Sequence, residues 1–342
     1  MWSAALEQHG HTGSGLSGTP IAAPLQLWSC ILRRRRPNVY IFRYLNDYVS
    51  LTKTIVRMIS EAAVIVTCWL FDIKIFWILH NVDRESFQYW PALSRLRRKA
   101  VALACHRAFV TDSLLINDAK RRFPKVIWAP LSFGVDVERA PEPSGHARIV
   151  SALAQLRKKL SRNPHRPAYV GLAVTSLSDK CQHLFRYSEL VANLPEWPFV
   201  IGLVFVSNFS GGSTKWKSIA ERMHNNPYIE IVDVEAKVDE TAIADSFDFI
   251  YRSLSDLSVP FTVYRAAAVR KPLITHEEGF VARLVSEYGV GIIWSPENVG
   301  SVNTFFRTWT RDQWSAFLTD RSWSCASLQL SRSVAGGRRN LA

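Results

Sequence analysis

The stretch KPLITHEEGFVARLVSEYGVGIIW, at residues 271–294, decides the fold class of this chain. It predicts an apolar strand, a glycine turn, a helix, a second turn and a second strand. Ahead of it, DFIYRSLSDLS at residues 248–258 predicts another strand that runs into a polar loop. Strands that alternate with helices predict a parallel sheet, whose ligands bind beyond the carboxyl ends of the strands. The loops at residues 252–258 and 275–279 are therefore candidate ligand loops.

The charge balance is the unusual feature of the composition. The 342 residues include 42 Lys and Arg against 29 Asp and Glu, a formal net charge of +13, whereas 48% hydrophobic and 21% charged residues are ordinary for a globular protein. This length allows two domains with separate cores. The basic clusters lie at residues 33–36, 95–99, 120–122 and 157–166. Because no motif that reads RNA or DNA is present, we expect an anionic membrane surface or a phosphorylated ligand rather than nucleic acid.

The cysteines and the apolar segments indicate the compartment. The five cysteines are odd in number and show neither a CxxC motif nor the Cys/His spacing of a zinc site, which fits a reducing cytoplasm. Residues 1–26 lack the basic start and apolar run of a signal peptide. The most apolar window, residues 62–79, is divided by Asp72 and Lys74, whereas a spanning helix needs about 20 mainly apolar residues. We expect a cytoplasmic protein, with peripheral attachment to the inner face of the plasma membrane as a further option.

Apolar periodicity divides the chain into alternating elements. The first half predicts strands at residues 37–43, 63–69, 75–79, 107–111 and 125–129, and helices at residues 48–61, 91–106 and 113–123. In the helix at residues 48–61, apolar spacing runs through Val49, Ile55, Val56 and Ile59; in the basic helix at residues 91–106, Leu93, Leu96, Val101 and Leu103 are the expected inner side. The second half predicts strands at residues 168–174, 199–206, 228–232 and 249–252, and helices at residues 182–194, 214–224, 239–247, 261–269 and 303–318.

Composition shifts suggest the domain limits. A segment rich in proline and basic residues interrupts the alternation before residue 168, as a connector between domains does. We therefore expect an α/β protein with two Rossmann-like domains that face a cleft, of which the N-terminal one is incomplete or atypical because no strand precedes its glycines. The expected parts are a poorly ordered segment (1–27), an N-terminal acceptor domain (28–150), a connector (151–167), a C-terminal nucleotide-sugar domain (168–302), and a C-terminal helix and tail (303–342).

Weak motifs in a fixed order carry a family resemblance across residues 37–300. In the first half they are IFWILHN at residues 75–81, AFVTD at 108–112 and VIWAPLSFG at 126–134. In the second half they are YVGL at residues 169–172 followed by Lys180, KPLIT at 271–275, the turn at Gly279, and GVG at 289–291. In this order they resemble the GT-B glycosyltransferases, in particular the family-4 and family-1-like bacterial enzymes that build exopolysaccharides.

The resemblance implies a metal-independent transferase that takes a sugar from a nucleotide-diphosphate-sugar donor, with no further cofactor. The acceptor would be a carbohydrate or a polyprenyl-linked oligosaccharide. Two positions depart from the family pattern. Leu172 stands where an arginine usually follows the first glycine of the C-terminal domain, and the paired glutamates with E-x7-E spacing are absent. The region of that pair is SDLSVPFTVYR at residues 255–265, which leaves the ribose and phosphate contacts open.

The candidate donor site follows from the chemistry of a diphosphate leaving group. Backbone N–H groups at helix starts, together with Lys or Arg, hold phosphates and stabilise charge as it develops. A purely structural role, as an exposed loop residue, a surface ion pair or a helix cap, is the alternative for these candidates. The candidate donor-binding residues are Gly171, Lys180, Arg252, Ser255, Ser258, Thr262, Glu277, Glu278 and Gly279. No DxD-type motif follows a strand, so we expect no metal.

The candidate acceptor side begins where an apolar strand ends at His80. A histidine there can take the proton of an acceptor hydroxyl, since its reference pKa is about 6.5, or it can simply cap the strand by hydrogen bonds. Asp83 is the alternative catalytic base, with Glu85 in the same loop, and Asn81 is a further loop contact. Whether the transfer inverts or retains the anomeric configuration is left open. The aromatic residues Phe87, Tyr89 and Trp90 precede the cationic helix, which suits contact with an anionic membrane.

Two other functions are compatible with the same residues. A sugar-nucleotide epimerase of this fold would need acidic residues in its cleft, and the chain offers few there. A non-catalytic nucleotide- or sugar-binding protein would explain the absent glutamate pair. A Rossmann dehydrogenase is disfavoured, because no GxGxxG follows a strand.

Overall fold

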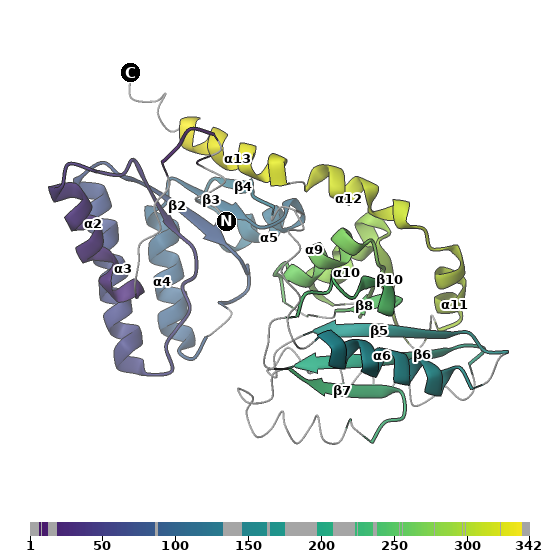
Figure 1. Ribbon diagram of the computed structural model, residues 1–342. Helices are drawn as coiled ribbons and strands as arrows, with labels where there is room; N and C mark the ends of the chain where they lie inside the picture. Colours follow the sequence, from purple (N-terminus) through teal and green to yellow (C-terminus); the bar gives the residue numbers. More distant parts are fainter. Residues whose placement is uncertain are drawn as a thin grey trace. The chain divides into compact units, whose positions relative to one another are not determined.

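The chain divides into two compact units, which are described one by one. The first unit comprises residues 1–134, 256–259 and 321–342, and the second comprises residues 135–255 and 260–320. The structure, a computed structural model, is shown in Figure 1. It describes residues 7, 9–12, 19–85, 88–132, 146–162, 165–174, 197–207, 223, 225–234, 238–252, 254, 256–276, 278–295, 297, 299–321 and 323–336.

The first unit is built on a four-stranded parallel sheet in the order β1-β2-β3-β4. β2 aligns with β3 from Phe76 opposite Arg107 to Leu79 opposite Val110. The strands are β1 (Val39–Phe42), β2 (Lys74–Leu79), β3 (Arg107–Val110) and β4 (Trp128–Pro130). The helices are η1 (Pro20–Ala22), α2 (Ala23–Leu32), α3 (Leu51–Leu70), α4 (Pro91–Ala104), η2 (Ser113–Leu115), α5 (Ile116–Arg122) and α13 (Trp323–Gly336).

The C-terminal helix α13 completes the core of this unit. Leu330 of α13 is fully buried against Phe76, Ile78 and Phe109 of the sheet. Just before α13, the guanidinium of Arg321 donates to both carboxylate oxygens of Asp112, at 2.7 and 3.0 Å, and both side chains are buried. The predicted final helix at residues 303–318 was therefore incomplete, because a further helix follows it.

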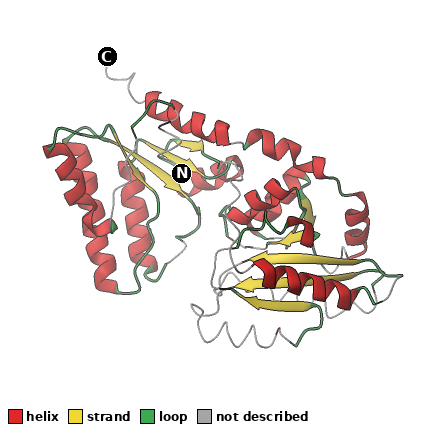
Figure 2. Cartoon of the chain, viewed as in Figure 1, coloured by secondary structure: helices red, strands yellow, loops and turns green. Residues whose placement is uncertain are grey.

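Helix α3 corrects the prediction of a strand at residues 63–69. The helix is continuous from Leu51 to Leu70 (Figure 2). Its buried side is largely polar and includes Thr54, Arg57, Ser60 and Glu61. The apolar residues Ile55, Val56 and Ile59, and Val49 just before the helix, are exposed. The apolar residues that suggested a core-facing side thus lie on the outside of the unit.

Helix α4 shows the same inversion. Leu96 and Leu103, two of the four expected inner residues, are exposed, and Arg97 and Arg98 are buried instead. The Arg97 guanidinium lies 2.7 Å from both the Asp47 and the Glu61 carboxylates, and Arg57 also pairs with Glu61 at 3.0 Å. Buried charges require such pairing, because an isolated one is too costly. The ion network between α3 and α4 therefore takes the place of an apolar contact.

The N-terminal segment also differs from its prediction. Residues 20–27, expected to be poorly ordered, form η1 and the first half of α2. The Ser60 hydroxyl of α3 donates to the carbonyls of Pro20 and Ile21, and Leu27 is buried. No helix among the described residues is long and apolar enough to cross a membrane.

The second unit has a six-stranded parallel sheet in the order β10-β9-β8-β5-β6-β7. Its strands are β5 (Ala168–Val174), β6 (Val200–Ser207), β7 (Ile229–Asp233), β8 (Phe249–Tyr251), β9 (Leu273–Thr275) and β10 (Gly291–Ile293). Its helices are α6 (His146–Leu160), η5 (Ala244–Ser246), α9 (Phe261–Val269), α10 (Gly279–Tyr288), α11 (Val299–Thr308), η7 (Arg311–Trp314) and α12 (Ser315–Asp320). The predicted alternation of strands and helices is confirmed by this parallel sheet.

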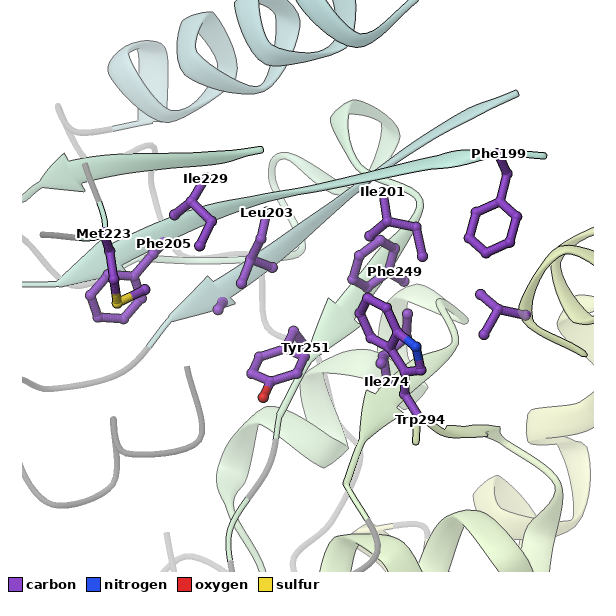
Figure 3. Close-up of a cluster of buried hydrophobic side chains, with 12 residues drawn as sticks. Phe199, Ile201, Leu203, Phe205, Met223, Ile229, Phe249, Tyr251, Ile274 and Trp294 are labelled. Atoms are coloured by element: carbon purple, nitrogen blue, oxygen red, sulfur yellow. The ribbon is translucent and has the colours of Figure 1, made fainter. Parts of the chain in front are cut away.

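Residues 271–294 fold as predicted into a strand, a helix and a second strand, and their glycines explain why. Gly279 has φ +86° at the start of α10, and Gly289 ends the same helix with φ +63°, a region that favours glycine. A Cβ at Gly291 would lie 2.1 Å from the Leu273 carbonyl oxygen, so the pairing of β10 with β9 requires glycine there. Figure 3 shows the core that these strands share, with Phe249, Ile274 and Trp294 in one cluster.

Five predicted segments of the second unit differ from their prediction or lie outside the described residues. Residues 239–247 form turns and the short η5 rather than a regular helix. The predicted helix at residues 303–318 is broken between α11 and η7. The helices predicted at residues 182–194 and 214–224 lie outside the described residues, apart from Met223. Residues 151–160 of the predicted connector belong to α6, whose Ile149, Leu153 and Leu156 are buried.

Candidate functional site

In the second unit, Arg252 lies at the carboxyl ends of the central strands of the sheet. The strand order changes direction between β5 and β8, and ligands of open parallel sheets bind at such a switch point. Arg252 follows β8 directly, and its Nη1 donates to the carbonyl of Val174, the last residue of β5, at 3.3 Å. The guanidinium therefore bridges the ends of the two strands at the switch point, where an anionic ligand would need a cation.

A buried polar pair lies at the ends of the neighbouring strands. The Tyr251 hydroxyl at the end of β8 lies 2.8 Å from Nε2 of His276, which follows β9. Nδ1 of His276 is 3.1 Å from the carbonyl oxygen of Trp294, so both ring nitrogens have polar neighbours. The sequence analysis missed His276 and Tyr251, although a polar residue directly after the apolar strand at residues 273–275 was an available signal.

Two helix starts lie close in sequence to these strand ends. Thr262 is buried in the first turn of α9, which begins after Pro260. Glu278 is exposed and precedes α10, whose first residue is Gly279. Neither Pro260 nor Glu278 caps its helix through a side chain, although the Val263 N–H of α9 donates to the Pro260 carbonyl at 3.0 Å.

Gly171 differs from the other predicted donor residues in its position. It lies inside β5, three residues before the strand ends, and a Cβ there would lie 2.1 Å from the Phe249 ring. Close packing against Phe249 thus requires this glycine whatever its relation to a ligand. Lys180, Ser255 and Glu277 lie outside the described residues.

In the first unit, the predicted acceptor loop follows β2 and is tightly organised. The Asn81 carboxamide oxygen accepts from the backbone N–H groups of Asp83 and Arg84, at 2.9 and 3.3 Å. Residues 256–259 pair with this loop, because Val82 N donates to Leu257 O and Asn81 forms an antiparallel bridge with Ser258. Ser258, predicted on the donor side, is therefore part of the first unit, next to Asn81.

Arg98 of α4 binds the backbone of the same loop. Its guanidinium donates to the carbonyls of Asn81, Val82 and Asp83 at 2.8–2.9 Å and lies 3.5 Å from the carboxylate of Glu85. Burial raises the pKa of Glu85, while the charge of Arg98 and the hydrogen bond from the Leu45 N–H oppose that rise. Both side chains are buried, which indicates that Glu85 braces the loop rather than contacting an acceptor.

His80 has an unusual environment for a proton acceptor. Its ring stacks on Tyr44 with 4.2 Å between centroids. Burial, and then the nearby charge of Arg43, lower the pKa of His80 to about 3. The imidazole is therefore neutral at pH 7 but weakly basic, whereas an efficient general base has a pKa near the working pH.

Asp83 is the more accessible of the two predicted bases. Its side chain is exposed, and one carboxylate oxygen accepts from the N–H of Leu257 at 2.9 Å. This hydrogen bond from the backbone orients the carboxylate. Among the described residues, no three His, Cys, Asp or Glu side chains are grouped as a metal site requires.

The predicted residues thus form two sets, one in each unit. His80, Asn81, Asp83, Glu85 and Ser258 are gathered around the loop after β2 of the first unit. Arg252, Thr262, Glu278 and Gly279 belong to the second unit, at or after the ends of β8 and β9. Tyr44, Arg98, Tyr251 and His276 join these sets although the sequence analysis did not select them.

Two comparisons by sequence found no match. No family model matches it, and no curated protein matches it. The fold, in contrast, has many solved counterparts.

Three solved structures illustrate the likeness. HepE of Anabaena in complex with UDP has a TM-score of 0.60 at 12% identity, covering 97% of this chain and 88% of that one. A sucrose-phosphate synthase from Thermosynechococcus elongatus has a TM-score of 0.62 at 12% identity, with 95% and 80% covered. A UDP-forming trehalose-phosphate synthase from Burkholderia xenovorans has a TM-score of 0.59 at 9% identity, with 98% and 82% covered. The structural neighbours are GT-B glycosyltransferases, and the α/β fold of this chain, with its two parallel sheets, is of their kind.

Proposed function

We propose that this chain is a glycosyltransferase that uses a nucleotide-diphosphate sugar as donor. The observation that carries the proposal is Arg252, whose guanidinium spans the ends of β5 and β8 at the switch point of the second sheet. The likeness to HepE, which has been solved with UDP and with UDP-glucose, supports the choice of a nucleotide sugar. The proposed acceptor is a carbohydrate or a lipid-linked oligosaccharide of polysaccharide assembly.

The proposed chemistry assigns each set of residues one task. In the second unit, Arg252 and the N–H groups at the starts of α9 and α10 stabilise the diphosphate as it leaves. The acceptor hydroxyl oxygen forms a bond to the anomeric carbon as the bond from that carbon to the diphosphate breaks. In an inverting reaction, a base takes the hydroxyl proton, and the exposed carboxylate of Asp83 suits this task better than His80 with its pKa of about 3.

Nucleotide binding tests the donor side. Isothermal titration of the full chain with UDP and with GDP should show binding of at least one, and Arg252→Ala should weaken it by about tenfold to a hundredfold, the loss of a hydrogen bond to a charged group. Lys180→Ala tests the second predicted cation in the same way. The control is Arg162→Ala, an exposed arginine that precedes β5 at the opposite edge of the sheet. If neither nucleotide binds, or if Arg252→Ala binds as well as the control, the donor site is wrongly assigned.

The products separate the alternative functions. Transfer to an acceptor, or release of free sugar with UDP, supports the transferase. Conversion of one nucleotide sugar into its epimer, without acceptor, would support the epimerase. Binding without turnover of any donor would favour a non-catalytic protein, an outcome that the missing glutamate pair at residues 255–265 makes worth testing.

A further inference from the structure

The outward side of α3 is an apolar surface that the described residues of the first unit leave exposed. Leu51 at the start of the helix is exposed, and so are the six apolar side chains that we call the α3 outer face: Ile55, Val56, Ile59, Val66, Trp69 and Leu70. Val66 is 54% exposed and Trp69 is 80% exposed, values usual for lysine or glutamate rather than for valine or tryptophan. Lys53 is the one exposed charged residue of this 20-residue helix.

The helix cannot hide this face by rolling about its axis. Its opposite side is fixed by Arg57 and Glu61, which pair with each other and with the buried Arg97 of α4. A rotation of the helix about its axis would break these ion pairs and leave buried charges without a partner. The free-energy cost of an unpaired buried charge exceeds the gain from burying the apolar side chains. The outer face is therefore a permanent feature of the folded first unit.

The apolar surface extends onto both neighbouring helices. Figure 1 shows α2, α3 and α4 side by side in the first unit. Leu25 and Leu32 of α2 are 76% exposed, and Leu96 and Leu103 of α4 are also exposed. Trp28 of α2 packs edge-on against Phe71 at the end of α3, at 5.2 Å. Exposed large apolar side chains thus occur on three neighbouring helices, as they do at interaction sites.

The charges around this surface identify what it meets. The exposed charged side chains within α2, α3 and α4 are Lys53, Arg95 and Lys99, all cationic, and one exposed acid, Asp72, follows α3. Four further exposed arginines, residues 33–36, follow α2 directly. A second copy of this chain would bring cations against cations, whereas anionic lipid headgroups would attract them.

We propose that the first unit docks on an anionic lipid surface through the α3 outer face. Helix α3, about 30 Å long, lies in the plane of the interface with Trp69 and Trp28 at headgroup depth. The cations of residues 33–36 and of α4 bind the headgroups. This inference does not depend on the proposed transfer reaction, because it concerns only the surface of the first unit. It also replaces the expected membrane contact of the whole Arg95–Lys99 cluster, since Arg97 and Arg98 are buried.

Vesicle sedimentation tests the apolar part of the contact. The full chain is mixed with phosphatidylcholine vesicles that contain or lack phosphatidylglycerol, and it should sediment with the anionic ones. Val66→Glu should lower the partition coefficient by about tenfold or more, the loss of one buried valine side chain. Val150→Glu makes the same change at an exposed valine of α6 in the second unit and should leave binding unchanged. Circular dichroism melting shows that both variants are folded.

Neutralisation tests the cationic part. Arg35→Gln and Arg36→Gln should each weaken binding about fivefold, the equivalent of about 1 kcal/mol per cation near an anionic surface. Equal binding to neutral and anionic vesicles, or equal binding of the two Val→Glu variants, would overturn the proposal. So would a dimer in lipid-free solution that Val66→Glu dissociates, because the face would then belong to a second copy.

Discussion

Buried charged side chains, paired with one another, occupy part of the interior of the first unit. Arg97 and Arg98 come from a cluster that the sequence assigned to a solvated or membrane-facing surface, because arginine is rarely buried. Their partners are distant in sequence: Arg97 pairs with Asp47 and Glu61, and Arg98 supports the loop at residues 81–85. Local periodicity cannot reveal a partner that lies tens of residues away. The candidate loop itself was predictable, because His80 ends an apolar strand.

The depressed pKa of His80 makes stability depend on pH. Because the folded state holds this imidazole neutral down to about pH 3, the unfolded state binds more protons below about pH 6.5. The stability that His80 contributes is therefore present above the unfolded pKa and is lost as pH falls from about 6.5 towards 3. We expect His80→Phe, which keeps an aromatic ring against Tyr44, to reduce this loss by up to about 1.4 kcal/mol per pH unit.

Urea unfolding at a series of pH values between 7 and 4 measures this difference. The stability of the wild type should fall more steeply than that of His80→Phe as pH falls, because the variant lacks the titrating group. Parallel curves would show that the His80 imidazole is protonated equally in the folded and unfolded chain, and that it is less buried than its contact with Tyr44 indicates.

Elements whose apolar residues face the core were predicted well. Helices whose polar side faces the core were not. β5, α9, and the strand-helix-strand unit at residues 271–294 match their predictions because glycine turns and apolar strands leave one solution. α3 was divided into a helix and a strand, because residues 62–70 are continuously apolar and short apolar runs do not distinguish the two. Its polar side faces inward, so the usual rule for choosing the core face gave the wrong side.

Two glycines in the second unit should respond oppositely to alanine. Gly171→Ala places a Cβ against the buried Phe249 ring and should destabilise the protein by about 1–3 kcal/mol. Gly300→Ala, in α11, meets nothing within 4 Å and should be neutral or stabilise by up to about 1 kcal/mol. Denaturant unfolding of both variants measures the contrast. A Gly171→Ala variant as stable as the wild type would mean that β5 and β8 are less closely packed than described.

At the scale of the whole molecule, the first unit draws on three separate parts of the chain. Residues 256–259 and 321–342 join residues 1–134. No motif marks the return of the chain, and the sequence analysis placed residues 303–342 in a separate C-terminal part. A helix can be predicted from its own residues, but the sheet on which it packs depends on distant contacts that a single sequence does not show.

The return of α13 predicts a contrast between two leucines of the same helix. Leu330 is fully buried in the core of the first unit, and Leu328 is 38% exposed. Leu330→Ala should cost about 2–5 kcal/mol, since it opens a cavity among Phe76, Ile78 and Phe109. Leu328→Ala should change stability by no more than about 0.5 kcal/mol. Thermal unfolding of the full chain compares them, and equal melting temperatures would remove α13 from the first core.

The distant position of α13 also bears on how the protein is made. Since Arg321 and Leu330 follow the second unit in the chain, the ribosome completes the second unit before it releases the helix that covers the sheet of the first unit. During that interval Phe76, Ile78 and Phe109 lack part of their cover. A nascent chain of this design depends on chaperones, or on rapid completion, more than one whose domains are contiguous in sequence.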